Sequence, residues 1–220
     1  ITYSDNNTYI GVCFLEGTLL RMSSGDVEIE NVQVGDKIIA CTGAELQTRQ
    51  ITWVGQVHTT VRSELPDDEA GYPVRILAGA LGDTVPYKDL LVTSEHCLFL
   101  EGNFVPVRML VNGASIYYDK SITSYNYYHV ETRQHSIILA NGAPTESYLD
   151  TGNRHIFKQV GNIVSIGARQ KSWTQAAAPL CVDRSIVEPL HVQIAQRAHA
   201  LNIPSIEENT RVLTEEASLH

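Results

Sequence analysis

The stretch from residue 13 to residue 40 reads CFLEGTLLRMSSGDVEIENVQVGDKIIA, and it decides the fold class of this 220-residue chain. Short β-prone runs alternate in it with two turns, Ser24-Gly25-Asp26 and Val34-Gly35-Asp36. Glycine adopts the backbone conformations of tight turns at little cost, and Asp stabilises turns with its own side chain. The pattern therefore predicts three short strands, at 18–22, 27–29 and 37–40.

The same alternation of apolar runs and turns continues to about residue 140. Further strands are expected at 51–60, 74–77, 90–92, 97–100, 104–110, 115–118, 125–131 and 136–140, with loops at 63–72 and 79–88. Glu101-Gly102-Asn103 and Asn141-Gly142 are typical of hairpin turns. About ten short strands, with turns roughly every 8 to 12 residues, predict an all-β unit that is barrel-like or sandwich-like.

The character of the sequence changes after residue 152. Residues 161–180 are irregular and rich in Ala and Gln, whereas residues 189–201 have apolar side chains at helical spacing. Pro189 suits the first turn of a helix. The apolar stripe comprises Leu190, Ile194, Ala198 and Leu201, and Asn202 and Pro204 end it. We therefore expect a C-terminal extension, residues 153–220, with a helix at about 189–201 that packs on the β unit.

Charge and hydropathy exclude several classes of protein. The formal net charge is −9, and the 16 Lys and Arg residues form no cluster larger than a pair, so no nucleic-acid partner is expected. No run of about 18 apolar residues exists that could span a membrane, and no signal peptide is visible. The chain begins at Ile1 rather than at Met, so we expect it to be a fragment of a longer polypeptide.

The four cysteines do not form a metal-binding pattern. None lies within four residues of another, so the CxxC spacing of zinc sites is missing, and the sequence indicates no metal or organic cofactor. A disulfide framework is not expected in a chain of this length, although a single bridge stays open. We expect Cys41, Cys97 and Cys181 to be small buried hydrophobes.

Three separated segments carry side chains that can perform chemistry. The first is CFLEGT at 13–18, the second is LVTSEH at 91–96, and the third is YYHVE at 127–131, which leads to His135 and Asn141-Gly142. Each segment alone has an ordinary explanation, because a Cys at a strand start is often buried and a lone TxxH is common. What indicates a function is the order and spacing of the three segments in a strand-rich chain.

That order resembles the Hint family, which includes inteins and the autoprocessing domain of hedgehog proteins. The resemblance is closest to bacterial Hint proteins, through LVTSEH, LVNG at 110–113 and ESYLDTGNR at 146–154, and a bacterial subfamily also shares the 173–201 region. It implies a horseshoe-like fold of short antiparallel strands over 13–152, preceded by an extein-like segment at 1–12. It leaves the location open, and a secreted or cell-surface bacterial protein is one expectation.

The resemblance makes Cys13 the nucleophile and the Val12–Cys13 peptide bond its target. Attack on the Val12 carbonyl would convert the amide into a thioester by an N-to-S acyl shift. A free thiol has a pKa of about 8.5, so a base or a positive charge must generate the thiolate. His96, with an ordinary His pKa near 6.5, would donate a proton to the leaving nitrogen. Thr93 would hold the same stretch of backbone.

Two further histidines are candidates. His129 stands where inteins commonly carry an acidic residue after the Tyr, and it could activate Cys13 or water. His135 lies about one residue from the position of another family histidine. For both, a structural or exposed histidine remains an equal alternative.

The end of the resemblance departs from a splicing intein. Inteins end with His-Asn followed by Cys, Ser or Thr, whereas Thr145, Glu146 and Ser147 occupy those places here. Without a side-chain amide to cyclise, and with a carboxylate as a poor substitute, splicing is not expected. The expected outcome is N-terminal cleavage or ligation, in which water, a thiol or an amine resolves the thioester. Ser147 is a possible acyl acceptor.

Two functions remain open at this stage. In the first, the domain is an autocatalytic, single-turnover module whose substrate is the upstream domain of its own polypeptide. In the second, it is a non-catalytic structural or interaction module of a larger exported protein. The retained Cys13, Thr93 and His96 favour the first, whereas the missing terminal Asn and the β-branched Val12, which hinders attack, favour the second.

Overall fold

The computed structural model describes residues 12–43, 45–160 and 170–206 of the chain. Most of the lead-in segment 1–12 and most of the polar C-terminal tail lie outside these ranges. Among the described residues, no helix is long and apolar enough to cross a membrane.

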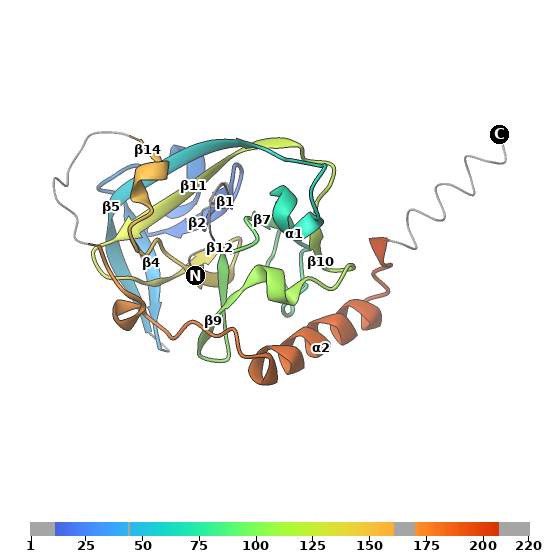
Figure 1. The fold of residues 1–220 in the computed structure, drawn as a ribbon. Coiled ribbons are helices and arrows are strands. Elements are labelled where there is room, and N and C mark those ends of the chain that lie inside the picture. The colour runs from blue at the N-terminus through green and yellow to red at the C-terminus, as the bar shows by residue number, and fades with distance from the viewer. Residues whose placement is uncertain (1–11, 44, 161–169, 207–220) are drawn as a thin grey trace.

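The described chain is mostly antiparallel β-structure with one long C-terminal helix, so the all-β class and the helical extension are confirmed (Figure 1). The strands are β1 Phe14–Leu15, β2 Leu19–Met22, β3 Gly25–Glu28, β4 Lys37–Thr42, β5 Glu45–Thr60, β6 Val74–Ile76, β7 Leu90–Val92, β8 Cys97–Leu100, β9 Asn103–Pro106, β10 Ile116–Tyr118, β11 Ser124–Thr132, β12 Ile137–Ala140, β13 Ala143–Glu146 and β14 Lys158–Gln159. The helices are α1 Asp67–Ala70 and α2 Arg184–Ala200, and the 3-10 turns are η1 Ile29–Asn31, η2 Val107–Leu110, η3 Arg154–Ile156 and η4 Trp173–Gln175.

Two long strands form the spine of the sheet. β5 pairs with β11 from Ser124–Thr60 to Thr132–Ile51, and its N-terminal half pairs with β4. The main path of hydrogen-bonded strands runs β10-β6-β7-β1-β11-β5-β4-β2-β12-β13-β8-β9. The short strand β1 therefore lies between β7 and β11, although 75 residues separate Leu15 from Leu90 in the sequence. This non-local pairing brings separate sequence segments together around residue 13.

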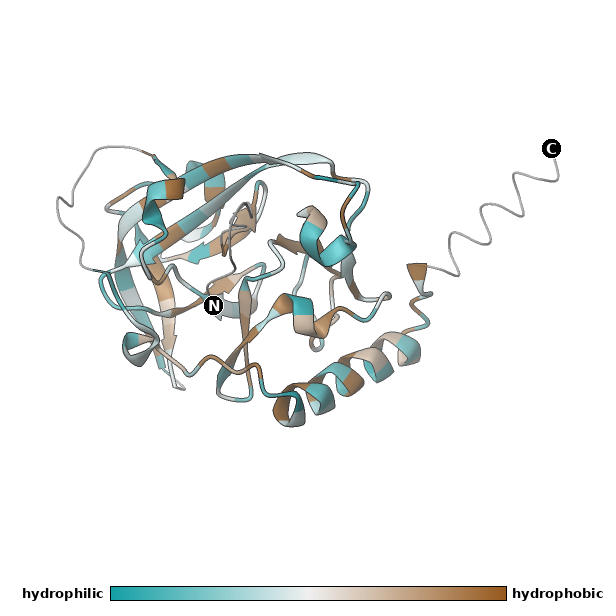
Figure 2. Cartoon of the chain, in the orientation of Figure 1, coloured by the Kyte–Doolittle hydropathy of each residue, from teal (hydrophilic) through white to brown (hydrophobic). Residues whose placement is uncertain are grey.

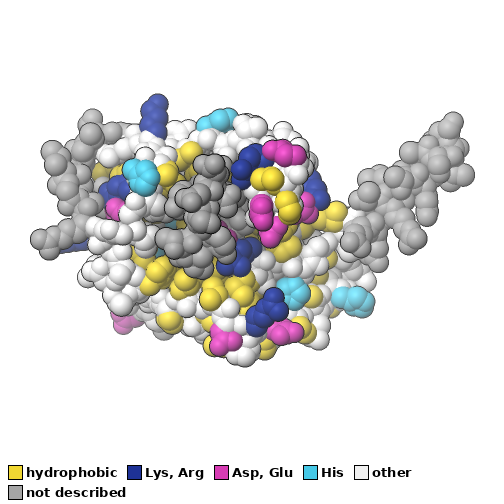
Figure 3. Space-filling model, viewed as in Figure 1, with side chains coloured by type: hydrophobic (Ala, Val, Ile, Leu, Met, Phe, Trp, Pro, Cys, Tyr) yellow, Lys and Arg dark blue, Asp and Glu magenta, His cyan; other side chains and the backbone are white. Residues whose placement is uncertain are grey.

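Burial follows the two-residue period of a strand that is apolar on one face. In β4, Ile38 and Ala40 are buried, whereas Lys37 is exposed and Ile39 and Cys41 are only partly buried. The main core gathers such residues from strands throughout the sheet and includes Val187 and Ile194 of the C-terminal helix. On the face drawn in Figure 3, Lys and Arg side chains are scattered rather than gathered into one patch.

The predicted strand at 104–110 is wrong in its second half. β9 ends at Pro106, and residues 107–110 form the turn η2. Proline has no N–H to donate to a strand ladder, which favours an end at this position. The next two backbone N–H groups bind outside the strand ladder. Val107 N donates to His96 O at 2.9 Å, and Arg108 N donates to Ser94 O at 2.9 Å. The turn thereby holds the backbone of residues 94–96.

The C-terminal helix is longer than its sequence pattern predicts. α2 begins at Arg184 rather than at Pro189, so Pro189 lies inside the helix and not in its first turn. Asp183 caps the helix, because its side chain accepts a hydrogen bond from Ser185 N at 2.9 Å. Figure 2 shows apolar and polar bands alternating along α2. Val187 joins the buried face, whereas Leu201 is 49 % exposed just beyond the helix.

Polar contacts also fasten α2 to the β unit. His191 Nε2 bonds to Val111 O at 3.1 Å, and Arg197 Nε donates to Gly79 O at 2.7 Å. Arg197 additionally forms an ion pair with Asp83. The helix α2 is thus packed on the β unit, as the sequence indicates.

Replacing Gly55 by alanine is expected to lower the free energy of unfolding by about 1 to 3 kcal/mol, the usual cost of overpacking. A Cβ atom at Gly55 would lie 2.2 Å from Cη2 of Trp53 and 2.9 Å from Cδ1 of Phe157. Trp53 is itself buried and has little room to move away. Urea denaturation measures the change. At Gly82 the nearest atom would be Val85 Cβ at 3.8 Å, so Gly82→Ala is the matched control. Equal losses in both variants would contradict the steric explanation.

Candidate active site

Cys13 lies at the centre of three strands. It directly precedes β1, whose Phe14 pairs with Val92 of β7 on one side and with Tyr128 of β11 on the other. The side chain of Cys13 is fully buried. This pairing places two further residues near Cys13: Thr93, which follows Val92, and His129, which follows Tyr128.

Thr93 holds the backbone of Cys13 on both sides. Cys13 N, which is the nitrogen of the Val12–Cys13 peptide bond, donates to Thr93 Oγ1 at 2.9 Å. Thr93 N donates in turn to Cys13 O at 3.0 Å. All these groups are buried, where a hydrogen bond is stronger than in water. The orientation of the peptide group before Cys13 is therefore set by a residue 80 positions away.

His96 is positioned by the turn that Thr93 begins. His96 N donates to Thr93 O at 3.0 Å, and its ring centroid lies 4.3 Å from that of Phe14. Its Nε2 is hydrogen-bonded to Thr145 Oγ1 of β13. Its Nδ1 is buried and has no hydrogen-bond partner within the described part of the chain.

The pKa values of His96 and Cys13 differ from those that the sequence suggested. Burial lowers the pKa of His96 to about 3, so its ring is neutral at pH 7, and the expected ordinary pKa is wrong. Burial, with a smaller contribution from the charge of Glu146, raises the pKa of the Cys13 thiol well above its usual value. In the folded protein at rest, Cys13 is thus a thiol and His96 is an uncharged imidazole.

His129 joins the same cluster. It is fully buried on β11 opposite Gly55, and its ring centroid lies 5.5 Å from those of Phe14 and of His96. Its Nδ1 accepts a hydrogen bond from Val130 N at 3.1 Å, and its Nε2 has no partner among the residues described. Burial lowers its pKa well below the usual value, and nearby His96 and His135 lower it further. His129 is therefore neutral, with an N–H at Nε2.

His135 has both ring nitrogens occupied. Its Nε2 donates to Ser147 O at 2.7 Å, and its Nδ1 accepts from Ala177 N at 3.1 Å. Burial lowers the pKa of His135 to about 4. Ala177 belongs to the C-terminal extension, so this histidine joins the extension to β12 and β13. The geometry favours the structural alternative for His135.

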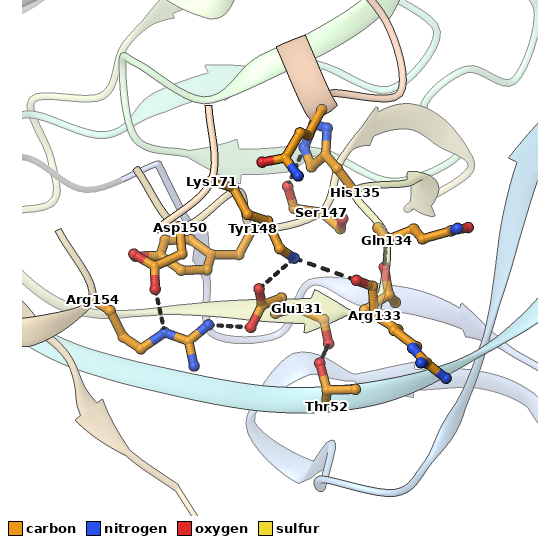
Figure 4. Close-up of polar contacts among 12 residues, drawn as sticks. Thr52, Glu131, Arg133, Gln134, His135, Ser147, Tyr148, Asp150, Arg154 and Lys171 are labelled. Atoms are coloured by element: carbon orange, nitrogen blue, oxygen red, sulfur yellow. Dashed lines mark hydrogen bonds and ion pairs between the residues drawn. The ribbon is translucent and has the colours of Figure 1, made fainter. Parts of the chain in front are cut away.

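Ser147 is held in the same place, next to His135 (Figure 4). Its Oγ accepts from Ser136 N at 2.9 Å, and its own N donates to Ser136 O at 2.9 Å. In the described part of the chain, no hydrogen bond joins Ser147 to Cys13. Its role as an acyl acceptor stays a prediction without geometric support.

The segment after Ser147 is anchored by an ion-pair network around Glu131 of β11 (Figure 4). Lys171 Nζ lies 2.7 Å from Glu131 Oε1, and Arg154 binds the other carboxylate oxygen. Arg154 also pairs with Asp150 at 2.9 Å. These contacts fasten Arg154 and Lys171 of the C-terminal extension to β11, the strand that carries His129.

Glu146 is a buried acid that the sequence did not single out as a site residue. It is fully buried on β13, and its Oε1 accepts from Cys97 N at 2.8 Å. Burial raises the pKa of Glu146 to about 8, against the opposing hydrogen bond from Cys97. The residue is therefore an uncharged carboxylic acid at neutral pH, whereas the sequence alone suggested a carboxylate. Nothing in the local sequence signals this, because burial is a tertiary property.

Glu146→Gln is expected to stabilise the protein more at pH 8 than at pH 5. The folded pKa of about 8 lies above the unfolded value of 4.5, so wild-type stability is complete below pH 4.5 and falls as the pH rises towards 8. Glutamine imitates the neutral acid and removes this loss. The gain at pH 8 should exceed that at pH 5 by on the order of 3 kcal/mol, measured by urea unfolding at both values.

Glu64→Gln is the control for this experiment, because Glu64 is exposed. Its effect on the free energy of unfolding should be small and nearly independent of pH. A Glu146→Gln variant that behaves like the Glu64→Gln variant would show that Glu146 is already ionised in the folded protein at pH 7.

The four cysteines are all free: Cys97 and Cys181 are buried as expected, and Cys41 is only half-buried. Within the residues that the structure describes, no group of three His, Cys, Asp or Glu side chains is arranged to hold a metal ion.

Fold and site together define a class of protein: a β domain that buries a cysteine near its start and clamps it with a Thr-x-x-His turn. The family model described as the Hint domain matches residues 12–152, and the chain belongs to this family. The family resemblance of the sequence is thereby confirmed.

Comparison with solved structures returned intein-related domains. The bacterial intein-like domain of Clostridium thermocellum is 16% identical with a TM-score of 0.46, and the match covers 63% of this chain and 99% of that one. A DnaB intein from Synechocystis sp. PCC 6803 is 15% identical with a TM-score of 0.42, and the match covers 62% and 98% of the two chains. No curated protein matches the sequence.

Proposed function

We propose that this domain cleaves the polypeptide that contains it, at the Val12–Cys13 peptide bond, with Cys13 as the nucleophile. The observation that carries the proposal is the hydrogen bond from Cys13 N to Thr93 Oγ1. It ties the nitrogen of that bond to the first residue of the Thr-x-x-His turn. A buried backbone N–H needs a partner in any protein, and here that partner is the hydroxyl of the turn that also carries His96, not the carbonyl of a neighbouring strand.

The first step is proton transfer from the Cys13 thiol to the free lone pair of His96 Nδ1. The thiolate sulfur then attacks the Val12 carbonyl carbon, and a tetrahedral intermediate forms. As the C–N bond breaks, His96 Nδ1 returns its proton to the Cys13 nitrogen, which leaves as an amine. The products are a thioester between Val12 and the Cys13 sulfur and a neutral His96, so no proton is gained or lost.

The pKa directions predict which half of this cycle is difficult. An imidazole with a pKa of about 3 is a weak base, and the thiol pKa is raised, so the first transfer is strongly uphill. The resulting imidazolium is a strong acid, so the return of the proton to the leaving nitrogen is easy. We therefore expect slow cleavage, which accords with the β-branched Val12 before the scissile bond.

The thioester is then resolved by water, by a small thiol or by an amine, which releases or ligates the upstream domain. Splicing is not part of the proposal, because Glu146 stands where an intein has Asn and carries no amide. The Glu131 network ties Arg154 and Lys171 to β11, and this supports a domain that keeps these parts of its C-terminal extension. The upstream domain of the same polypeptide is the intramolecular substrate.

The second candidate is a non-catalytic module that shares the fold. Complete burial of Cys13 and its raised pKa favour it, because reactive cysteines are usually partly exposed with a lowered pKa. The two functions differ in whether any thioester forms.

The deciding experiment places a reporter domain before Ile1 and incubates the purified fusion with and without an excess of a small thiol. Autoprocessing yields a product that starts at Cys13 and, when the thiol is present, an upstream fragment that ends in a Val12 thioester. Mass spectrometry identifies both, and hydroxylamine converts the thioester to a hydroxamic acid. A fusion that stays intact in thiol and hydroxylamine over several days would leave the non-catalytic module as the function.

A further inference from the structure

The hydroxyl group of Thr145 lies between two groups of the candidate site. It donates a hydrogen bond to Cys97 O at 2.8 Å, and it is also in hydrogen-bond contact with His96 Nε2. Thr145 is fully buried, and pairing of β13 with β8 at Thr145–Leu98 sets its place beside residues 96 and 97. The contacts therefore belong to the sheet register and not to a mobile surface side chain.

A hydroxyl group has one hydrogen, and this fixes the direction of the two bonds. A carbonyl oxygen only accepts, so the hydrogen of Thr145 must point to Cys97 O. The remaining lone pairs of Thr145 Oγ1 can then only accept, so His96 Nε2 carries a hydrogen. In a neutral imidazole one nitrogen has the hydrogen and the other has a lone pair. The lone pair is consequently at Nδ1.

A second observation on the His96 tautomer concerns the other ring nitrogen, Nδ1. This atom is buried and lacks a hydrogen-bond partner in the described ranges, whereas Nε2 is paired. Since no described group bonds to this nitrogen, its lone pair is available to accept a proton.

We propose that Thr145 is a positioning residue that sets the tautomer of His96, so that Nδ1 of the resting site is a ready proton acceptor. The proposal rests on the function proposed above and adds a residue outside the Thr-x-x-His turn. With the opposite tautomer, Nδ1 would bear a hydrogen and could not take the Cys13 proton. Throughout the proton cycle Nε2 keeps its hydrogen and its bond to Thr145, so only Nδ1 gains and loses a proton.

The tautomer is measurable without any cleavage. Nitrogen-15 NMR of the 220-residue chain at pH 7 distinguishes a protonated ring nitrogen from an unprotonated one by its chemical shift. The expected result for His96 is a hydrogen at Nε2 and none at Nδ1. A wild-type spectrum with the hydrogen at Nδ1 would overturn the proposal, and this measurement needs no variant to fold.

A pair of variants tests the consequence. Thr145→Val removes the hydroxyl at nearly constant shape, and Thr145→Ser retains it. Loss of the acceptor for a buried N–H should weaken the tautomer preference and slow Val12–Cys13 cleavage by roughly 10-fold to 100-fold in Thr145→Val. Thr145→Ser should cleave within about threefold of wild type and keep the wild-type His96 spectrum. If both variants cleave equally and keep the same tautomer, Thr145 does not position His96.

Failure of the proposed function gives a different pattern. In that case neither wild type nor variants cleave in thiol or hydroxylamine, while the wild-type NMR spectrum still reports the His96 tautomer.

Discussion

We expect Cys13→Ala to abolish the proposed cleavage at the Val12–Cys13 bond in a reporter fusion, with or without added thiol. Alanine removes the sulfur that forms the thioester and leaves the backbone N–H of residue 13 free to keep its hydrogen bond to Thr93 Oγ1. Fragment formation should fall to the background of uncatalysed hydrolysis, a loss far larger than any variant in the surrounding shell can produce.

Two features make this variant informative. The cavity left by a fully buried sulfur is small, so the fold should persist, and a circular dichroism spectrum checks this. Cys97→Ala is the matched control, because Cys97 is also buried and has a raised thiol pKa. Cleavage that survives in Cys13→Ala at the same bond would refute Cys13 as the nucleophile.

His96→Ala should slow the same cleavage by roughly 10²-fold to 10⁴-fold, the usual contribution of a positioned general acid and base. The loss arises because no group then takes the thiol proton and returns it to the leaving nitrogen. Cleavage by single-turnover kinetics, followed over days, gives the rate. His58→Ala is the control, because His58 is exposed on the far part of β5 and should leave the rate unchanged.

The pH dependence of the cleavage rate tests whether the His96 ring is neutral in the folded protein. With a pKa of about 3, His96 remains neutral from pH 8 down to pH 5, so its protonation should not reduce the rate in that range. An ordinary histidine base would instead lose activity below pH 6.5. A fall in the wild-type rate centred near pH 6.5 that disappears in His96→Ala would contradict the buried, neutral state of this ring.

His129 and His135 show how far sequence reasoning extends at this site. Both lie close to the family positions in sequence, and nothing local distinguishes them. The fold separates them, because His129 Nε2 has no hydrogen-bond partner among the residues that the structure describes, whereas both ring nitrogens of His135 are hydrogen-bonded, to Ser147 and to Ala177. Ala177 is 42 residues away from His135, so no local pattern contains this contact.

The two boundary corrections have the same origin. Pro189 reads as a helix start, yet Asp183 supplies a cap six residues earlier, and the buried Val187 extends the apolar face in that direction. The run 104–110 reads as one strand, but Val107 and Arg108 find better partners in the backbone of residues 94–96. In both places a tertiary contact outweighs a local preference.

The residues alone were sufficient for the fold class, the family and the identity of the clamped cysteine. The fold class rests on periodicity and turn chemistry, whereas the family and the choice of Cys13 rest on a motif order that resembles the Hint family; all of these are properties of the linear chain. The protonation states depend on the folded molecule: the low pKa of His96, the neutral Glu146 and the His96 tautomer that we propose Thr145 sets. The reason is physical, because a pKa and a tautomer depend on desolvation and on partners that the sheet register brings from distant positions.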